Sequence, residues 1–299
     1  MINGIINVYK EKGYTSFDVV AKMRGIFHQK KIGHTGTLDP DAEGVLPVCL
    51  GKATKVCDLL TEKDKEYKAV LLLGIQTDTQ DITGEVLQQS DVNVTEDEVK
   101  AVIESFVGEY QQVPPMYSAL KVNGQKLCDL ARKGITVERK ARQVKIHHIE
   151  ILRMELPEVE FVVSCSKGTY IRTLCEDIGR TLGCFGCMKS LLRTRVDRFE
   201  LEHAYRLAEL EELTAAPPEE WGFIEPVDCV FTKYNTVTAS ERASKLVANG
   251  NRISVEYITD WSNNKGNIVR LYDHTNRFIG LYTYIEESKE YKPLKLFMD

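Results

Sequence analysis

The sequence predicts a mixed α/β or α+β layer in which helices pack on a central sheet. Residues 66–74 and 159–165 alternate in character as strands do, and helical patterns lie between and after them. No Gly-x-Gly-x-x-Gly signature is present, so a dinucleotide-binding fold is not indicated. Interleaved strands and helices of this kind favour helices layered on a sheet.

Three predicted helices have recognisable ends. Ser16 can cap a helix whose apolar residues recur at helical spacing up to Phe27. Thr95 and Glu98 form a capping box ahead of a second helix. A third helix begins near residue 171 and is stopped by Gly183, because glycine accepts the left-handed conformation that ends many helices.

The chain of 299 residues is long enough for two domains, and its composition marks a boundary. Residues 207–226 are acidic and contain Pro217-Pro218, which indicates a linking region. Beyond it, a short helix over 240–248 is followed by several short strands separated by turns. We therefore expect a first domain over residues 1–228 and a small β-barrel over residues 229–299.

Composition indicates a cytoplasmic protein. The N-terminus lacks a secretory signal pattern, and the longest apolar run, near residues 69–73, is too short to cross a bilayer. The 8 cysteines follow no regular framework, which favours reduced thiols. Cys184 and Cys187 form a lone Cys-x-x-Cys pair, whereas zinc needs four ligands, so we predict no metal.

The charges are unevenly distributed. A net charge of −5 argues against a nucleic-acid partner, but phosphate binding depends on where the cations lie. Residues 121–145 are locally basic, and a second basic cluster, Lys189, Arg193, Arg195 and Arg198, follows later. Either run alone is as consistent with a solvated face as with a binding surface.

The most informative stretch is residues 33–47, Gly-His-Thr-Gly-Thr-Leu-Asp-Pro-Asp-Ala-Glu-Gly-Val-Leu-Pro. An isolated Asp-Pro is usually only a turn element. Here Pro40 holds Asp39 extended, and the glycines of the stretch permit close approach of the backbone. The stretch therefore presents one carboxylate beside a histidine and several hydroxyls.

This stretch and three later blocks resemble the motifs of the TruB-type tRNA pseudouridine synthases. The run Gly-Thr-Leu-Asp-Pro-x-Ala-x-Gly-Val-Leu-Pro is similar to the catalytic motif, and residues 65–79 contain a second motif. Residues 114–124 resemble the RNA-clasping loop of the family, and residues 166–172 resemble its third motif. The resemblance implies a catalytic domain with a central mixed, largely antiparallel sheet flanked by helices, followed by a PUA-like RNA-binding barrel.

The implied reaction is the isomerisation of uridine to pseudouridine in the T-loop of tRNA, at uridine 55 in tRNA numbering, on a base flipped out of its stack. An isomerisation needs no redox or group-transfer cofactor. By the resemblance, Asp39 is the ionised carboxylate that acts as nucleophile or base. Arg172 pairs with Asp39 and lowers its pKa, and Tyr67 stacks on the uracil.

The resemblance also implies how the RNA is bound. Tyr170 and Leu191 line the base pocket, and His34 fills the space that the flipped base leaves. Three lysines are expected to contact phosphates, the last of them within a clasp loop of about residues 112–145: Lys10, Lys55 and Lys121. The expected partner is the T-arm stem-loop of tRNA, with no membrane, no obligate protein partner and a monomeric enzyme.

Taken singly, these residues have ordinary explanations. Arg172 fits a surface cation, Tyr67 a cross-strand packing residue, and His34 a solvated loop residue. Three other functions therefore stay open: an RNA-binding protein without catalysis, a guide-RNA-dependent synthase within a ribonucleoprotein, and a glycoside hydrolase that pairs Asp39 with Asp41 or Glu43.

Overall fold

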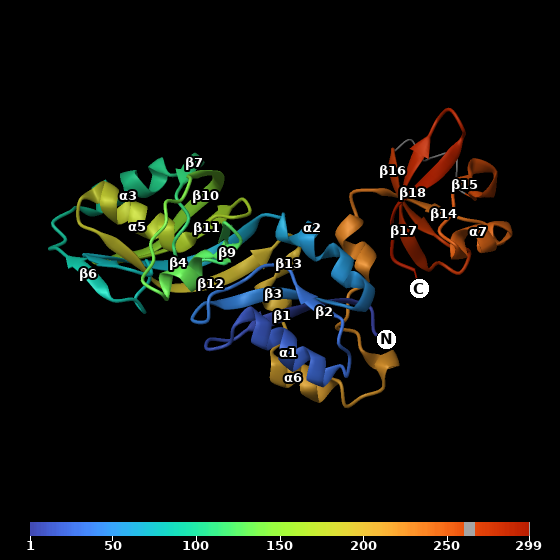
Figure 1. Cartoon of the computed structure of the whole chain (residues 1–299), viewed down its shortest axis with the longest axis horizontal. Coiled ribbons are helices and arrows are strands. Elements are labelled where there is room, and N and C mark those ends of the chain that lie inside the picture. Colours follow the sequence, from blue (N-terminus) through green and yellow to red (C-terminus); the bar gives the residue numbers. More distant parts are fainter. Residues whose placement is uncertain (260–266, 299) are drawn as a thin grey trace.

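The computed structural model describes residues 1–259 and 267–298 and arranges them as two sheets with associated helices (Figure 1). The larger sheet has nine strands: β1 (Gly4–Lys10), β2 (Ile32–His34), β3 (Glu43–Leu50), β4 (Lys65–Leu73), β7 (Gly108–Gln112), β10 (Arg142–Glu155), β11 (Glu158–Cys165), β12 (Gly186–Val196) and β13 (Phe199–Glu200). The helices are α1 (Ser16–Ile26), α2 (Cys57–Thr61), α3 (Glu96–Ser105), α4 (Leu127–Ala131), α5 (Ile171–Leu182), α6 (Leu207–Leu213) and α7 (Ser244–Ala248). The predicted combination of helices with a largely antiparallel sheet is confirmed.

The order of strands in the larger sheet is β1-β3-β12-β4-β11-β10-β7. All of these neighbours are antiparallel except β3 and β12, which run parallel. At this parallel seam Gly44 lies opposite Arg193, and a Cβ on Gly44 would lie 2.2 Å from the Arg193 carbonyl oxygen. Gly44 also has φ of +106°, so glycine allows the two halves of the sheet to meet.

Helices cover each half of this sheet. Helices α3 and α5 pack on β4 and β11, where residues such as Val99, Phe161 and Ile178 are fully buried. Helices α1 and α6 pack on β1 and β3 instead, and Figure 1 shows the two helix pairs over different parts of the sheet. The acidic segment over residues 207–226 is therefore not merely a linker, because Leu207 and Leu210 of α6 belong to the core.

The predicted helix ends are largely confirmed. Thr95 and Glu98 form the reciprocal capping box, and Gly183 ends α5 with φ of 75°. At α1 the cap is Thr15, one residue before the expected Ser16. The Ser16 hydroxyl instead accepts a hydrogen bond of 2.9 Å from the Leu38 backbone N–H. Leu38 lies in the loop that contains Asp39, so Ser16 helps to hold this loop.

The smaller sheet has the order β14-β16-β17-β18-β15 and lies beside the larger one in Figure 1. Its strands are β14 (Asn235–Thr238), β15 (Ile253–Ser254), β16 (Ile268–Tyr272), β17 (Phe278–Ile285) and β18 (Glu290–Leu296). This sheet curls into a half-barrel. Phe278 of β17 and Phe297, which follows β18, pack against Phe231 in a hydrophobic cluster that also contains Ile5 and Val45 of the larger sheet. The two sheets are therefore joined through a shared apolar core.

Two short hairpins lie outside these sheets. The strands are β5 (Ile75–Thr77) with β6 (Val86–Gln89), and β8 (Lys121–Val122) with β9 (Gln125–Lys126). The β8–β9 hairpin belongs to the predicted clasp loop, and its tip residues Asn123 and Gly124 both have positive φ. Asn-Gly is the preferred pair for such a two-residue turn.

Candidate active site

Asp39 lies in the loop between β2 and β3, and hydrogen bonds hold this loop on several sides. The Pro40 carbonyl accepts hydrogen bonds from the Gly13 backbone N–H and from Lys10 Nζ, at 2.9 and 3.1 Å. The Gly36 carbonyl accepts a hydrogen bond of 3.2 Å from Arg193 Nη2. These contacts fix the backbone on both sides of Asp39 and so orient its carboxylate.

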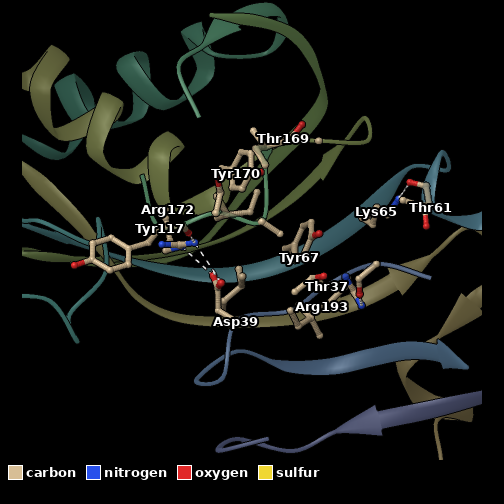
Figure 2. A pocket seen from close by; sticks show the side chains of 18 of the residues that line it. Thr37, Asp39, Thr61, Lys65, Tyr67, Tyr117, Thr169, Tyr170, Arg172 and Arg193 are labelled. Carbon is tan, nitrogen blue, oxygen red and sulfur yellow. Dashed lines mark hydrogen bonds and ion pairs between the residues drawn. The ribbon is translucent and has the colours of Figure 1, made fainter. Parts of the chain in front are cut away.

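Arg172, the second residue of α5, forms an ion pair with this carboxylate (Figure 2). Its Nε lies 2.9 Å from Asp39 Oδ2 and its Nη2 lies 3.2 Å from Asp39 Oδ1. The same guanidinium donates to the carbonyls of Thr79, at 2.9 Å, and Tyr117, at 2.8 Å. Arg172 therefore connects the catalytic-type motif, the second motif and the clasp loop, and its rigid fork suits this task.

The pKa of Asp39 reflects two opposing effects. Burial raises the pKa above the usual value for a carboxyl group, and the Arg172 guanidinium works in the other direction. We predicted a lowered pKa from the Arg172 pairing alone, and that prediction is wrong in its net direction because burial outweighs the ion pair. Arg172 thus favours the ionised form of Asp39, against the effect of burial.

The carboxylate faces a cavity of about 330 Å³. Tyr67 and Tyr170 line the cavity (Figure 2). Leu191 also belongs to its lining, so the three residues predicted to contact the base are brought together. Burial raises the pKa of the Tyr67 hydroxyl, which is therefore protonated at neutral pH. Gln112 fixes the Tyr170 backbone from both sides, donating to its carbonyl and accepting from its N–H.

A second cavity of about 530 Å³ meets the first at Asp39 and Arg172. Its wall includes Asp81, whose Oδ2 lies 3.9 Å from Arg172 Nε, and Arg132 of the clasp loop. The ion pair between Asp39 and Arg172 therefore separates an aromatic chamber from a more polar one. An extended ligand can occupy both chambers with its reacting atom at Asp39.

Lys10 does not fit the predicted phosphate contact. It is fully buried, and its ammonium donates to the carbonyls of Glu11, Tyr14 and Pro40 at 3.2, 2.6 and 3.1 Å. Burial lowers its pKa to about 8. Lys10 thus supports the loop of Asp39 from beneath, where a phosphate has no access.

Substitution of Lys10 by methionine is expected to destabilise the fold by about 1–3 kcal/mol, because buried carbonyls lose their donor. Urea unfolding measures the change, and Lys12→Met, which removes an exposed cation in the turn that follows β1, is the matched control. If K10M were as stable as wild type and its RNA binding depended less on salt, the original prediction that Lys10 contacts a phosphate would be supported.

Of the other residues predicted to bind RNA, the two lysines lie at the surface and His34 lies next to the loop that contains Asp39. Lys121 is exposed on β8. Lys55 is exposed and donates to the Leu296 carbonyl at 2.8 Å, at the junction between the two sheets. His34 is half-buried at the end of β2, and its Nδ1 accepts from the Gly36 N–H at 3.2 Å. Burial lowers the pKa of His34, so its ring is neutral at pH 7.

The second basic cluster predicted from the sequence is not a free cationic surface. Lys189, Arg195 and Arg198 form ion pairs with Glu158, Glu66 and Glu225. Arg193 points the other way and is 1% exposed. The register of β12 shifts between Met188 and Ser190 and again between Arg193 and Arg195, so these cations do not share one face as plain alternation would require, and a linear count of charges does not reveal this.

Sequence reasoning also missed two cations in the aromatic cavity, Arg193 and Lys65. Arg193 faces Tyr67 across β12 and β4 and interacts with the Tyr67 hydroxyl. Lys65 is 7% exposed, and its ammonium donates to the carbonyls of Thr61 and Lys63. The strand alternation that places Tyr67 inward also places Lys65 inward, and this signal was present in the sequence.

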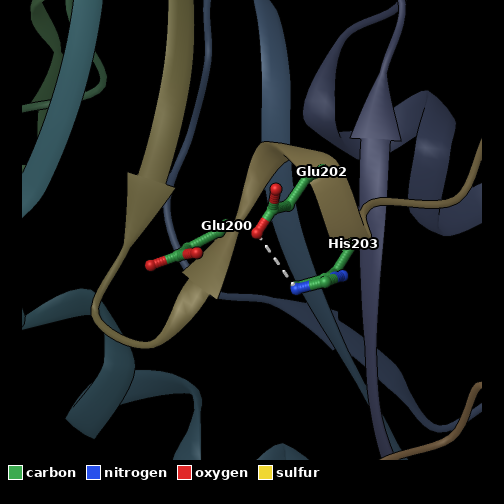
Figure 3. Close-up of side chains that lie close together, drawn as sticks. All are labelled: Glu200, Glu202 and His203. Carbon is green, nitrogen blue, oxygen red and sulfur yellow. Dashed lines mark ion pairs between the residues drawn. The ribbon is translucent and has the colours of Figure 1, made fainter.

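Potential metal ligands gather at one place among the described residues, where Glu200, Glu202 and His203 lie together (Figure 3). All three are exposed, and none lines either cavity at Asp39. Cys184 and Cys187 are buried free thiols. Within residues 1–259 and 267–298, no helix combines the length and apolarity needed to cross a bilayer.

Comparison with known proteins identifies the family. A model of the N-terminal domain of the TruB family pseudouridylate synthases matches residues 24–171, and one of the C-terminal domain of tRNA pseudouridylate synthase B matches residues 172–231. The chain belongs to the TruB family of pseudouridylate synthases. The family predicted from the sequence motifs is thereby confirmed, and this TruB-family chain is an isomerase.

Relatives match the TruB-family chain over its whole length. A protein named tRNA pseudouridine synthase B from Lachnoclostridium phytofermentans is 55% identical and covers 99% of this chain and 100% of the relative. One of the same name from Clostridium tetani is 45% identical, with 99% and 100% coverage.

Solved structures share the fold. The protein in an H/ACA RNP bound to a substrate RNA containing 2′-deoxyuridine has a TM-score of 0.72 and 27% identity, over 99% of this chain and 85% of that chain. A chain of a Cbf5-Nop10-Gar1 complex has a TM-score of 0.72 and 29% identity, with 99% and 85% coverage. The predicted pseudouridine-synthase fold with a PUA-like second sheet is confirmed.

Proposed function

We propose that this TruB-family enzyme isomerises uridine 55 in the T-loop of tRNA, and that Asp39 is the carboxylate that meets the ribose. One observation carries the proposal: Arg172 holds both oxygens of Asp39 where the aromatic cavity meets the second cavity. Relatives named tRNA pseudouridine synthase B support tRNA as the substrate.

The proposed pose follows from the lining of the two cavities. The flipped uracil enters the aromatic chamber between Tyr67 and Tyr170 and contacts Leu191, while its ribose stays at Asp39. The phosphates on either side of the target nucleotide then lie toward the second cavity, where Arg132 is placed. Flipping exposes a gap in the RNA stack, and His34, in the strand that leads into the Asp39 loop, is the residue we assign to that gap.

The lining of the aromatic cavity argues against a glycoside hydrolase. Such an enzyme needs two carboxyl groups on either side of a sugar. Among the described residues that line this cavity, Asp39 is the one carboxylate. Asp41 and Glu43 line the second cavity instead, where Asp41 forms an ion pair with Lys12 and Glu43 accepts a hydrogen bond from Tyr9. A single ionised carboxylate beside aromatic rings fits a base isomerisation better.

The proposed assembly is a monomer of two domains, residues 1–228 and 229–299, that needs no guide RNA or protein partner. The test is tritium release from unmodified tRNA transcript labelled at C5 of uridine, with purified protein and nothing added. Release at one equivalent per tRNA supports the proposal. Dependence on an added guide RNA or protein would favour the ribonucleoprotein alternative instead.

The clasp loop supplies the cations proposed to hold the T-arm. Lys121, Arg132 and Lys133 are exposed on or near the β8–β9 hairpin. Replacing all three with glutamine is expected to weaken tRNA binding and to reduce the salt slope of log K by about 2, roughly 0.7–0.9 per lost phosphate contact. Filter binding at several salt concentrations measures the slope.

The matched control for the clasp is a triple substitution of exposed cations elsewhere: Lys22→Gln, Lys30→Gln and Lys100→Gln. The control should leave the slope unchanged, because these residues lie outside the clasp and both cavities. An unchanged salt slope in the clasp variant would show that these three clasp residues do not contact RNA phosphates.

A further inference from the structure

The aromatic cavity carries more positive charge than the reaction assigned to Asp39 explains. Its described lining contains three cations, Lys65, Arg172 and Arg193, and one carboxylate, Asp39. Arg172 pairs with Asp39 at one end. Lys65 and Arg193 lie toward the other end, with Tyr67 between the two groups (Figure 2). One end of the cavity is thus neutralised, and the other end keeps an excess of positive charge.

The two cations at the far end are buried, and neither has an ion-pair partner among residues 1–259 and 267–298. Arg193 is 1% exposed, and it donates to the carbonyls of Val45, at 2.7 Å, and Gly36, at 3.2 Å. Lys65 donates to the carbonyls of Thr61 and Lys63. Among the described residues, no carboxylate lies within 4.0 Å of either cationic group. Burying an uncompensated charge is unfavourable, so a negative ligand group is expected at this end.

The isomerisation produces such a group. When the bond from C1′ to N1 breaks, its electron pair stays on the uracil, whose charge spreads over N1 and the carbonyl oxygens. C1′ of the ribose is left electron-deficient. Either an Asp39 oxygen forms a bond to C1′, or Asp39 takes the C2′ proton and a double bond forms between C1′ and C2′. C5 then bonds to C1′ and Asp39 is regenerated, after which C5 loses its proton and N1 gains one. Atoms and electrons balance without a co-reactant.

We propose that Lys65 and Arg193 form a cationic wall that stabilises the detached uracil anion during this reaction. The inference rests on the proposed function. Preorganised donors that face developing charge in a water-poor site are a large source of rate acceleration. Arg193 also interacts with the Tyr67 hydroxyl, so this phenol lies beside the two cations at the same end of the cavity.

Lys65 is the better residue for a test. Arg193 holds the Gly36 carbonyl in the loop of Asp39, so its removal would disturb the carboxylate as well as the wall. Within the part of the chain that the structure describes, the Lys65 ammonium donates hydrogen bonds only to carbonyls of its own segment, residues 61–63. Lys63, two residues away, pairs with Asp197 and does not line the cavity. Lys63→Met is therefore the matched control for Lys65→Met.

The first experiment compares two leaving groups. T-arm stem-loops carry uridine or 5-fluorouridine at the target, and single-turnover loss of the target nucleoside is followed by chromatography of digested RNA. We expect K65M to slow uridine loss by ~100-fold, the size typical of losing one such donor. Fluorine withdraws electrons and stabilises the anion by itself, so the defect should be clearly smaller with 5-fluorouridine. Equal defects on both substrates, or a K65M rate equal to that of K63M, would overturn the proposal.

The second experiment uses pH and needs only a conservative variant. Burial and the neighbouring Arg193 lower the pKa of Lys65 to about 8. Three further groups face Lys65: Cys165, Asp64 and Asp197. Burial raises the pKa of Cys165 to about 12, so this thiol stays neutral. The wild-type rate should therefore fall as pH rises through about 8, where Lys65 loses its charge.

Lys65→Arg keeps its charge at these pH values, so the variant should be active and should lose this alkaline decline. Lys10 also has a pKa of about 8, and Lys10→Arg shows whether its own titration contributes. An alkaline decline that is identical in wild type and K65R would exclude the charge of Lys65 from the reaction. Thermal unfolding of each variant separates a folding defect from a chemical one.

The outcomes distinguish this inference from the function on which it rests. Wild-type protein that fails to convert uridine in the stem-loop contradicts the proposed function. Wild-type protein that converts it, with K65M and K65R indistinguishable from wild type, contradicts the cationic wall alone.

Discussion

Asp39→Asn is expected to abolish pseudouridine formation, with a loss of at least about 10³-fold in the single-turnover rate. The amide keeps the shape of the side chain, and its oxygen can still accept one of the two hydrogen bonds from Arg172, but it carries no charge to attack C1′ or to take a sugar proton. Binding of tRNA should stay nearly unchanged, since affinity comes mainly from phosphate contacts. Tritium release and filter binding measure the two quantities.

The control for this substitution is Asp91→Asn, an exposed carboxylate in the loop before α3. Its activity should equal that of wild type. Normal turnover by D39N would overturn the proposed mechanism, whereas a parallel loss of activity and affinity would indicate that residue 39 shapes the RNA site instead of reacting.

Arg172→Met is expected to be nearly as damaging, with activity lower by at least ~10² and a changed pH dependence. Burial already raises the pKa of Asp39, and Arg172 opposes that rise. Without the guanidinium the pKa of Asp39 increases further. Because the ionised carboxylate is required, the rate falls as pH drops through this pKa, and the acid-side decline must move to higher pH.

The measurement is the single-turnover rate across the acid range for wild type, R172M and R172K. Lysine keeps the charge but cannot span both Asp39 oxygens and the carbonyls of Thr79 and Tyr117. R172K should therefore restore the position of the acid-side decline more than the maximal rate. An R172M profile that is superimposable on wild type after scaling would show that Arg172 does not control the ionisation of Asp39.

The sequence predicted the helix ends and the elements that carry the site, because these depend on local signals. The capping box at Thr95 and the αL residue at Gly183 are set by neighbouring residues. Alternation correctly placed Tyr67 on a strand. The motif blocks predicted that Asp39 and Arg172 lie together although 133 positions separate them, and this pairing was available only through resemblance to a family.

The incorrect predictions concern cationic residues, because a lysine or arginine in a sequence is normally expected to be exposed to solvent. Lys10 is fully buried under a loop, and Arg193 is buried between two strands. Whether a cation is inward depends on which carbonyls the tertiary fold brings to it. The net direction of the Asp39 pKa was missed for the same reason, because burial is not visible in a linear sequence.

The parallel seam between β3 and β12 has a consequence for how the enzyme matures. Asp39 and Tyr67 come from the first quarter of the chain, whereas Arg172, Leu191 and Arg193 emerge from the ribosome much later. Local hairpins such as β10–β11 can form early, but pairings between distant segments are slow to close. The active site is therefore completed late in synthesis, after β12 has inserted between β3 and β4, which were made long before it.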